Sequence, residues 1–121
     1  MFLEEKIEDS HKLYCRVHRN NVRDNELLPI VFRERGEGEK KGMSVDWEKY
    51  ATPEDTRNRA TSAPIDNGII QFIAGNVREI GLTVVHAPED YNRAHSNIKG
   101  IESIRERLLA SDIYTWVINF A

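Results

Sequence analysis

The stretch IIQFIAGNVREIGLTVV, residues 69–85, decides the fold because it joins two strand patterns through one helical turn. Residues 69–74 are apolar on both faces, which is typical of a central strand. Asn76 is a good helix start, and Gly81 is a good helix stop because glycine readily adopts a left-handed conformation. Residues 82–85 then predict another strand. This succession indicates a domain that contains both kinds of element.

Upstream of this stretch, the sequence predicts three further elements. Residues 13–18 alternate between apolar and polar side chains, which favours a half-buried strand. Residues 27–32 are a second candidate strand, with Pro29 marking its start or a sheet edge. The residues TPED, 52–55, combine a capping hydroxyl, a proline at the first helical position and acidic side chains in the first turn. We therefore expect a short helix over residues 53–60.

Further elements complete a single α+β domain. Residues 43–47 form a short turn or strand segment, and residues 101–109 have an apolar stripe at helical spacing that includes Leu108. Residues 113–120 are rich in β-branched and aromatic side chains, which favours a final strand. Strands and helices do not alternate regularly. We expect one small domain over residues 1–121, with a mixed or antiparallel sheet of about five strands and two or three short helices.

Composition narrows the class of protein. The chain of 121 residues is 40% hydrophobic and 31% charged, which is typical of a globular domain. No apolar run approaches the roughly 20 residues that cross a bilayer, and the acidic N-terminus does not resemble a secretory signal. The single Cys15, expected in the core, suits a reducing compartment. We therefore expect a cytoplasmic protein without membrane association. Residues 33–42 are charged and contain three glycines, which predicts a mobile surface loop.

One polar segment contains most of the usable chemistry. The residues VVHAPEDYNRAHSNI, 84–98, follow a predicted strand, and we expect a loop that holds two imidazoles, two carboxylates and a guanidinium. An imidazole can exchange a proton near neutral pH when a carboxylate fixes its tautomer. His95, helped by Asp46 or Asp90, is therefore the candidate catalytic group. The structural alternative is that Asp90 and Asn92 cap turns while His95 bonds to backbone.

Basic side chains suggest a phosphate or carboxylate site. Arg16, His18, Arg93 and Asn92 are the candidate ligand-binding residues, because guanidinium groups bind such anions with two parallel hydrogen bonds. Arg33 and Arg35 could join them, and the rings of Tyr14, Trp47 and Tyr91 could stack on a base. The structural alternative is that the arginines form ordinary surface ion pairs. The net charge of −3 does not indicate nucleic-acid binding.

A metal site is a further candidate. His86 and His95 flank Glu89 and Asp90, and imidazole and carboxylate groups together can bind zinc. Such a site needs a third protein ligand, for which His18 or His11 is available. No cofactor is predicted by any sequence motif, because phosphate-loop, dinucleotide-binding and zinc-helix signatures are absent from the sequence.

Three segments together resemble a known family. The residues LYCRVH (13–18), GMSVD (42–46) and the run from Gly81 through Asn92-Arg93-Ala94-His95 resemble small uncharacterised prokaryotic proteins with a Leu-x-x-Arg first strand, a Ser-Val-Asp segment and an Asn-x-Ala-His loop. The resemblance implies no established activity. This chain departs from the pattern at Met43, at Ala87 and at Arg93.

Three functions remain open from the sequence. The first is a nucleotide- or phosphate-ligand-handling domain that uses an Arg/His loop, with a small phosphorylated ligand or nucleotide as its partner. The second is a non-catalytic protein–protein interaction module, one component of a two-protein cassette or a homo-oligomer. The third is a metal-binding domain built on His86 and His95.

Overall fold

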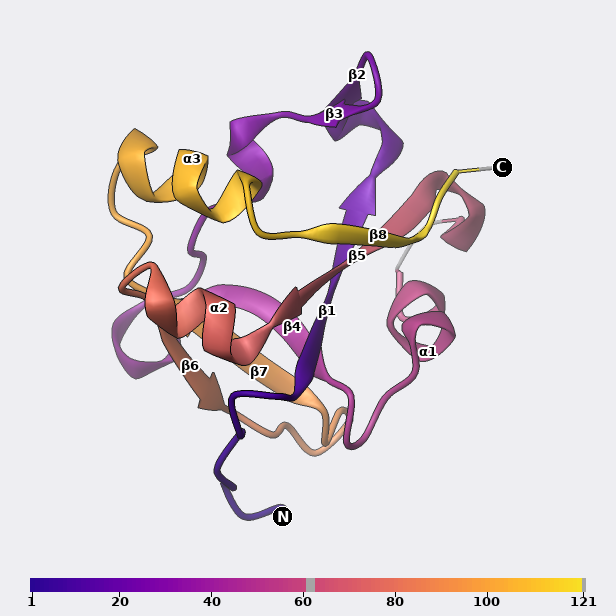
Figure 1. The fold of residues 1–121 in the computed structure, drawn as a ribbon. Coiled ribbons are helices and arrows are strands. Elements are labelled where there is room, and N and C mark those ends of the chain that lie inside the picture. Colours follow the sequence, from indigo (N-terminus) through magenta and orange to yellow (C-terminus); the bar gives the residue numbers. More distant parts are fainter. Residues whose placement is uncertain (61–62, 121) are drawn as a thin grey trace.

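The computed structural model describes residues 1–60 and 63–120, and six strands form one antiparallel sheet (Figure 1). In sheet order the strands are β6 (Thr83–His86), β7 (His95–Lys99), β4 (Met43–Trp47), β1 (Lys12–His18), β5 (Asn67–Ile73) and β8 (Thr115–Ile118). A separate hairpin consists of β2 (Val22–Arg23) and β3 (Glu26–Leu27). The helices are α1 (Pro53–Asn58), α2 (Ala74–Glu79) and α3 (Ile104–Ser111). The predicted α+β fold is confirmed.

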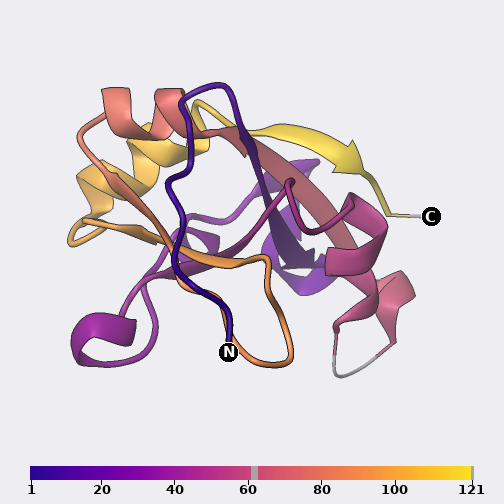
Figure 2. The ribbon, with the colours of Figure 1, turned by 90° about the horizontal axis from the view of Figure 1, so that it is seen from below.

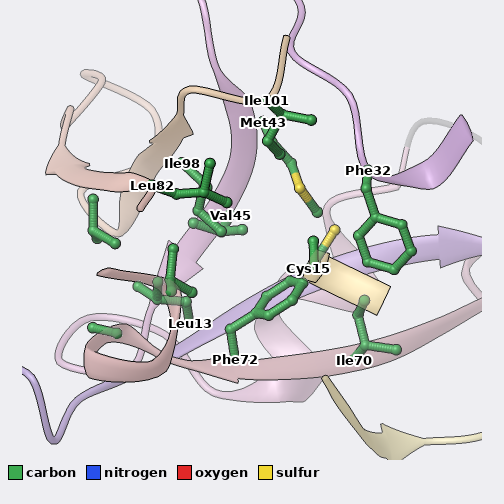
Figure 3. Packing of buried hydrophobic residues seen from close by; sticks show 14 of the residues in the cluster. Leu13, Cys15, Phe32, Met43, Val45, Ile70, Phe72, Leu82, Ile98 and Ile101 are labelled. Atoms are coloured by element: carbon green, nitrogen blue, oxygen red, sulfur yellow. The ribbon is translucent and has the colours of Figure 1, made fainter. Parts of the chain in front are cut away.

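The hydrophobic core lies between the sheet, α2 and α3. Every second residue of the central strands contributes to it, because alternate side chains of a strand point to the same face. Figure 3 shows these side chains converging with Phe32, which comes from outside the sheet and is fully buried. Helix α1 lies at the other end of the molecule, apart from α2 and α3 (Figures 1 and 2). Core residues include Leu13, Cys15, Val17, Met43, Val45, Ile70, Phe72, Val77, Ile98 and Ala110.

The predicted helix after Thr52 is confirmed, and its start is fixed by reciprocal capping. The Thr52 hydroxyl accepts a hydrogen bond from the Asp55 backbone N–H at 3.1 Å, and the Asp55 carboxylate accepts one from the Thr52 N–H at 2.9 Å. Such a capping box satisfies two backbone donors that have no partner within the helix. The helix ends at Asn58, two residues before its predicted limit.

Several predicted elements differ from the structure, including the helix expected to start at Asn76, which begins at Ala74. Residues 27–32 do not form a strand, because the chain turns into a 3₁₀ helix over Pro29–Val31. Pro29 lacks the N–H that a ladder needs but suits the first position of a helix, and the turn inserts Phe32 into the core. Leu108 was predicted on the buried stripe of the last helix and is 53% exposed. That helix begins three residues later than predicted.

The predicted loop over residues 84–98 contains strand β7, which the sequence prediction missed. β7 pairs with β4 on one side and β6 on the other, so its polar side chains are enclosed. Ser96 is fully buried and its hydroxyl donates to the Ala94 carbonyl at 3.1 Å. Asn97 is also buried and packs beside Gly42, where a Cβ atom would come within 2.6 Å of the Asn97 side chain. His95 therefore stands on a central strand and not on a loop.

The sheet opens between β1 and β4. These strands pair only at Leu13 with Trp47 and at Tyr14 with Asp46, although both continue beyond these pairs. Beyond them β1 stays paired with β5, and β4 stays paired with β7. The sheet therefore divides into two three-stranded halves that separate from this point onward (Figure 1).

Among residues 1–60 and 63–120, no helix has the length and apolar character needed to cross a membrane.

Candidate functional site

A cavity of about 430 Å³ lies where β1 and β4 separate, and we call it the arginine cleft. Its lining comes from β1, β4, α1, the segment before β4 and the segment that ends in β7. The lining residues are Tyr14, Cys15, Arg16, Val31, Arg33, Arg35, Met43, Ser44, Val45, Asp46, Thr56, Arg59, Glu89, Tyr91, Asn92 and His95. The predicted candidates Arg16, Asp46, Asn92 and His95 are thus brought together.

The arginine cleft is positively charged although the whole chain is negative. Four guanidinium groups and two carboxylates line it, which gives a formal charge of +2 against −3 for the chain. Only Arg59 is paired with a carboxylate, that of Asp46. In the described part of the chain, the side chains of Arg16, Arg33 and Arg35 form no ion pair. The cleft therefore has an excess of cationic groups that an anion can neutralise.

Arg33 is the most informative of these arginines. Its Nε atom is buried and has no hydrogen-bond partner among the described residues. A buried donor without a partner costs free energy, about 1–3 kcal/mol and more for a charged group. A ligand with acceptor oxygens that reached this nitrogen would remove this cost. The Nε atom of Arg107, which does not line the cleft, is also buried without a partner among the described residues.

The opened strands add backbone groups to the cleft. Alternate residues of an antiparallel strand direct their N–H and C=O groups to the same edge. The Lys12 carbonyl accepts a hydrogen bond from the Glu48 N–H at 3.0 Å across the β4 edge, so the backbone groups of Arg16 face the same way. Ser44 is the residue that would oppose Arg16, and the described strands contain no such pair. The backbone N–H and C=O groups of both residues therefore lack a ladder partner across the opening.

Asp46 anchors the base of the cleft. The side chain is buried, and its Oδ2 accepts hydrogen bonds from the Thr56 hydroxyl at 2.8 Å and from the Arg59 guanidinium. Its Oδ1 accepts a hydrogen bond from the Asn92 amide at 2.9 Å. Asp46 thus connects β4 to α1 and to the segment before β7, and both of its oxygens are occupied.

His95 lies directly opposite Asp46 in the sheet, since the two residues are cross-strand partners. Its ring is bonded elsewhere: Nδ1 lies 2.9 Å from the Ala87 carbonyl, to which it must donate, and 3.4 Å from the Glu89 carboxylate. The other ring nitrogen, Nε2, makes no hydrogen bond to any described residue. Ala87 and Glu89, and not Asp46 or Asp90, therefore fix the orientation of this imidazole.

Tyr14 lies on the other side of Asp46 from His95, because it is the residue of β1 that pairs with Asp46 of β4. Tyr14 is buried at the wall of the cleft. Burial raises the pKa of the Tyr14 phenol, and the nearby Glu48 and Glu54 carboxylates raise it further. The phenol therefore stays protonated at neutral pH and can donate a hydrogen bond to an anion.

Three predicted site residues lie outside the cleft lining. The His18 Nδ1 accepts a hydrogen bond from the Asn20 N–H at 3.1 Å and so caps a 3₁₀ turn. Asp90 is exposed in the turn between Glu89 and Asn92. Arg93 stacks on the rings of Tyr50 and Phe2, with its guanidinium carbon 4.1 Å and 4.9 Å from their centroids. Arg93 therefore belongs to the packing of the N-terminal segment.

His86, which was predicted to bind a metal together with His95, has both of its ring nitrogens engaged in hydrogen bonds. Its Nδ1 accepts from the Glu5 N–H at 2.9 Å, so Nε2 carries the proton and donates to the Arg93 carbonyl at 2.8 Å. Both nitrogens are occupied, and neither offers a lone pair to a metal. Among the described residues there is no group of three or more His, Cys, Asp or Glu side chains that could hold a metal ion.

The arginines of the cleft are the site residues that the sequence predicted least well. Arg59 was not predicted as a site residue, yet it forms an ion pair with the buried Asp46. Arg33 and Arg35 were treated as secondary, because nothing in the sequence locates residues 33–42 against β1. That segment is closed at its base by two backbone hydrogen bonds of 2.9 Å between Arg35 and Gly42. The three glycines and the charge pattern predicted the turn but not the side that it faces.

Comparison of the chain with protein-family models, with curated proteins and with solved structures gave no match. What the protein binds must therefore be inferred from the groups in the arginine cleft.

Proposed function

We propose that the arginine cleft binds a small phosphorylated ligand. One observation carries the proposal: Arg16, Arg33 and Arg35 line one cavity without a carboxylate partner among the described residues. Guanidinium groups match the geometry of phosphate oxygens and bind them with two parallel charge-assisted hydrogen bonds. In a chain with net charge −3, such a group of cations favours binding of a discrete anion over general attraction to nucleic acid.

The opening between the strands leaves unpaired backbone groups at the cleft. The backbone N–H and C=O groups of Arg16 and Ser44 lack ladder partners across it, and an N–H group there can donate to a phosphate oxygen. Asp46 does not oppose binding, because its charge is already compensated by Arg59. We therefore assign Asp46 and Asn92 to positioning, and the arginines without an ion pair to ligand binding. The Arg16 guanidinium is oriented by a hydrogen bond that its Nη1 donates to the Thr56 carbonyl at 3.2 Å.

His95 is the group we assign to proton exchange with the bound ligand. Its Nδ1–H is held by the Ala87 carbonyl, so a neutral ring presents Nε2 as an acceptor. Whether the protein turns its ligand over depends on this nitrogen. His95→Gln keeps a polar side chain of similar size and removes the titratable group, so it separates ligand binding from proton transfer.

Thermal unfolding with inorganic phosphate, pyrophosphate and ribose 5-phosphate tests the proposal. A ligand at a hundredfold excess over its Kd stabilises the native state by about 2.7 kcal/mol, which corresponds to several degrees in a domain of this size. We expect at least one of these anions to raise the midpoint. Arg35→Gln should weaken its binding about tenfold, because one charge-assisted hydrogen bond is lost.

Arg23→Gln is the matched control. Arg23 is an exposed arginine of β2 that lies outside the cleft lining, so its substitution should leave ligand binding unchanged. An equal loss in both variants would mean general charge attraction. If none of the three anions raises the midpoint, the phosphate proposal is wrong and the interaction module becomes the better description.

A further inference from the structure

An exposed aromatic ring at the cleft suggests the rest of the ligand. Tyr91 lines the arginine cleft, and its side chain is 81% exposed. Among the other described aromatic residues, only Phe2 is classed as exposed, at 37%, and the Arg93 guanidinium covers its ring. Tyr91 is therefore the described aromatic residue with the largest exposed fraction, and it lines the arginine cleft.

The Tyr91 ring is held in place although it is exposed. The backbone around it is a tight turn closed by two hydrogen bonds, of 3.0 Å and 2.9 Å, between Glu89 and Asn92. The Tyr91 hydroxyl donates to the Glu89 carboxylate. The turn itself is tied to the base of the cleft, because the Asn92 amide donates to Asp46. A ring fixed by its hydroxyl, with its faces open, loses little conformational entropy when another flat group stacks on it.

Charge orients the ligand across the cleft. The Glu89 carboxylate beside Tyr91 repels phosphate, whereas Arg33 and Arg35 attract it. A ligand with an anionic end and a flat uncharged end therefore places its phosphate among the arginines and its flat end against Tyr91. A nucleotide has this composition, and stacking on an aromatic side chain is tolerant of base identity because every base has a π face.

We propose that the ligand of the arginine cleft is a nucleotide whose base stacks on Tyr91. This inference rests on the phosphate-binding function proposed above and adds the class of ligand. Tyr91 contributes to the preference for nucleotides over other phosphates, and Glu89 supports it by holding the phenol.

Calorimetric titration of adenosine 5′-monophosphate and ribose 5-phosphate tests the inference. Both probes carry the same phosphoribosyl group, so the ratio of their Kd values measures the contribution of the base. We expect the nucleotide to bind about tenfold more tightly to the unaltered protein. The ratio should fall to about one in Tyr91→Leu and should largely persist in Tyr91→Phe, which keeps the ring. Phe2→Leu is the matched control, since it removes another exposed ring outside the cleft.

The outcomes separate the two proposals. If ribose 5-phosphate binds and the nucleotide binds no more tightly, the stacking inference is wrong and the phosphate function stands. If the nucleotide is preferred equally by the unaltered protein and by Tyr91→Leu, Tyr91 is not the stacking partner. If neither probe binds, the nucleotide inference is overturned, and the phosphate proposal falls with it when inorganic phosphate and pyrophosphate also fail to raise the unfolding midpoint. Titration with 2-aminopurine riboside 5′-monophosphate adds a direct signal, because stacking on an aromatic ring is expected to change the fluorescence of the base.

Discussion

A single carboxylate, Asp46, connects three separate parts of the chain. Thr56 and Arg59 reach it from α1 and its end, and Asn92 reaches it from the turn before β7. Because the side chain is only 7% exposed, these bonds replace water almost completely. The sequence suggested Asp46 as a partner of His95, yet no spacing rule could show that three other donors occupy its oxygens. Only the pairing of distant strands determines them.

Substituting Asp46→Asn tests this connecting role. The variant loses the ion pair with Arg59 and replaces an acceptor by a donor that faces other donors, so we expect a loss of about 2 kcal/mol in the free energy of unfolding. Arg59 is one-third exposed, which limits the loss because water can solvate its charge. Urea denaturation measures the difference. Asp90→Asn, at an exposed turn position, should change stability by less than about 0.5 kcal/mol.

Glu5 gives a pH-dependent contribution to stability. Hydrogen bonds from Lys49 and Tyr50 lower the pKa of its carboxyl below the ordinary value of 4.5. A carboxyl whose pKa is lower in the folded state stabilises that state above its unfolded pKa. This contribution is lost as the pH falls through the folded-state pKa. We therefore expect the unaltered protein to unfold at a higher temperature than Glu5→Gln at pH 7, with the difference shrinking below pH 4.5 and lost once the pH is below the folded-state pKa. A difference that persists in acid would contradict the charge-based explanation.

At the scale of elements, regular hydrophobic patterns were enough for most strands. The pattern of residues 13–18 predicted β1 within one residue, and the apolar run at residues 69–74 located β5. β7 has no such pattern, because its enclosed positions carry Ser96 and Asn97. A buried polar strand depends on partners on both edges, and those partners are far away in the sequence. The position of His95 on a rigid strand could therefore not be predicted locally.

Gly68 determines how closely β8 approaches β5. A Cβ atom at this position would lie 2.8 Å from the Ile118 carbonyl oxygen and 2.9 Å from the Trp116 ring. Such distances require backbone movement, so Gly68→Ala should displace β8 and destabilise the protein by about 1–3 kcal/mol. Chemical denaturation would show the loss. Gly81→Ala is a useful comparison: it meets no atom within 4 Å, so any loss there comes from its positive φ of 93° alone. Equal thermal stability of Gly68→Ala and the unaltered protein would contradict this close packing.

At the scale of the whole molecule, the arginine cleft exists because the sheet opens at one place. Its arginines come from β1, from the segment before β4 and from the end of α1, and only the closed fold brings them together. The net charge of −3 does not by itself indicate an anion site, although individual basic side chains suggested one. The local excess of positive charge depends on which acidic residues fall elsewhere on the surface. That distribution is a property of the tertiary structure and cannot be obtained from charge counts.

Cys15 is a chemical probe of this opening, because it is buried on β1 and also lines the cleft. Burial raises the pKa of its thiol from the ordinary value of 9.0 to about 12. At neutral pH its thiolate fraction is therefore about a thousandfold smaller than that of an ordinary thiol. We expect a thiol-specific reagent such as iodoacetamide to modify the folded protein far more slowly than the urea-unfolded chain.

The effect of phosphate on this rate relates the opening of the sheet to ligand binding. If Cys15 reacts only when the remaining pairs between β1 and β4 break, an anion held between these strands must slow modification, because it binds the form in which those pairs are intact. If Cys15 becomes reactive only by global unfolding, phosphate should slow modification by the same factor by which it lowers the unfolding equilibrium constant. If phosphate slows modification by less than this factor, Cys15 is exposed by a local motion that does not disrupt the phosphate site. In Arg35→Gln the protection by phosphate should weaken in proportion to the loss of affinity. The protection is measured against the same variant without phosphate, because the Arg35 charge also lowers the pKa of the Cys15 thiol.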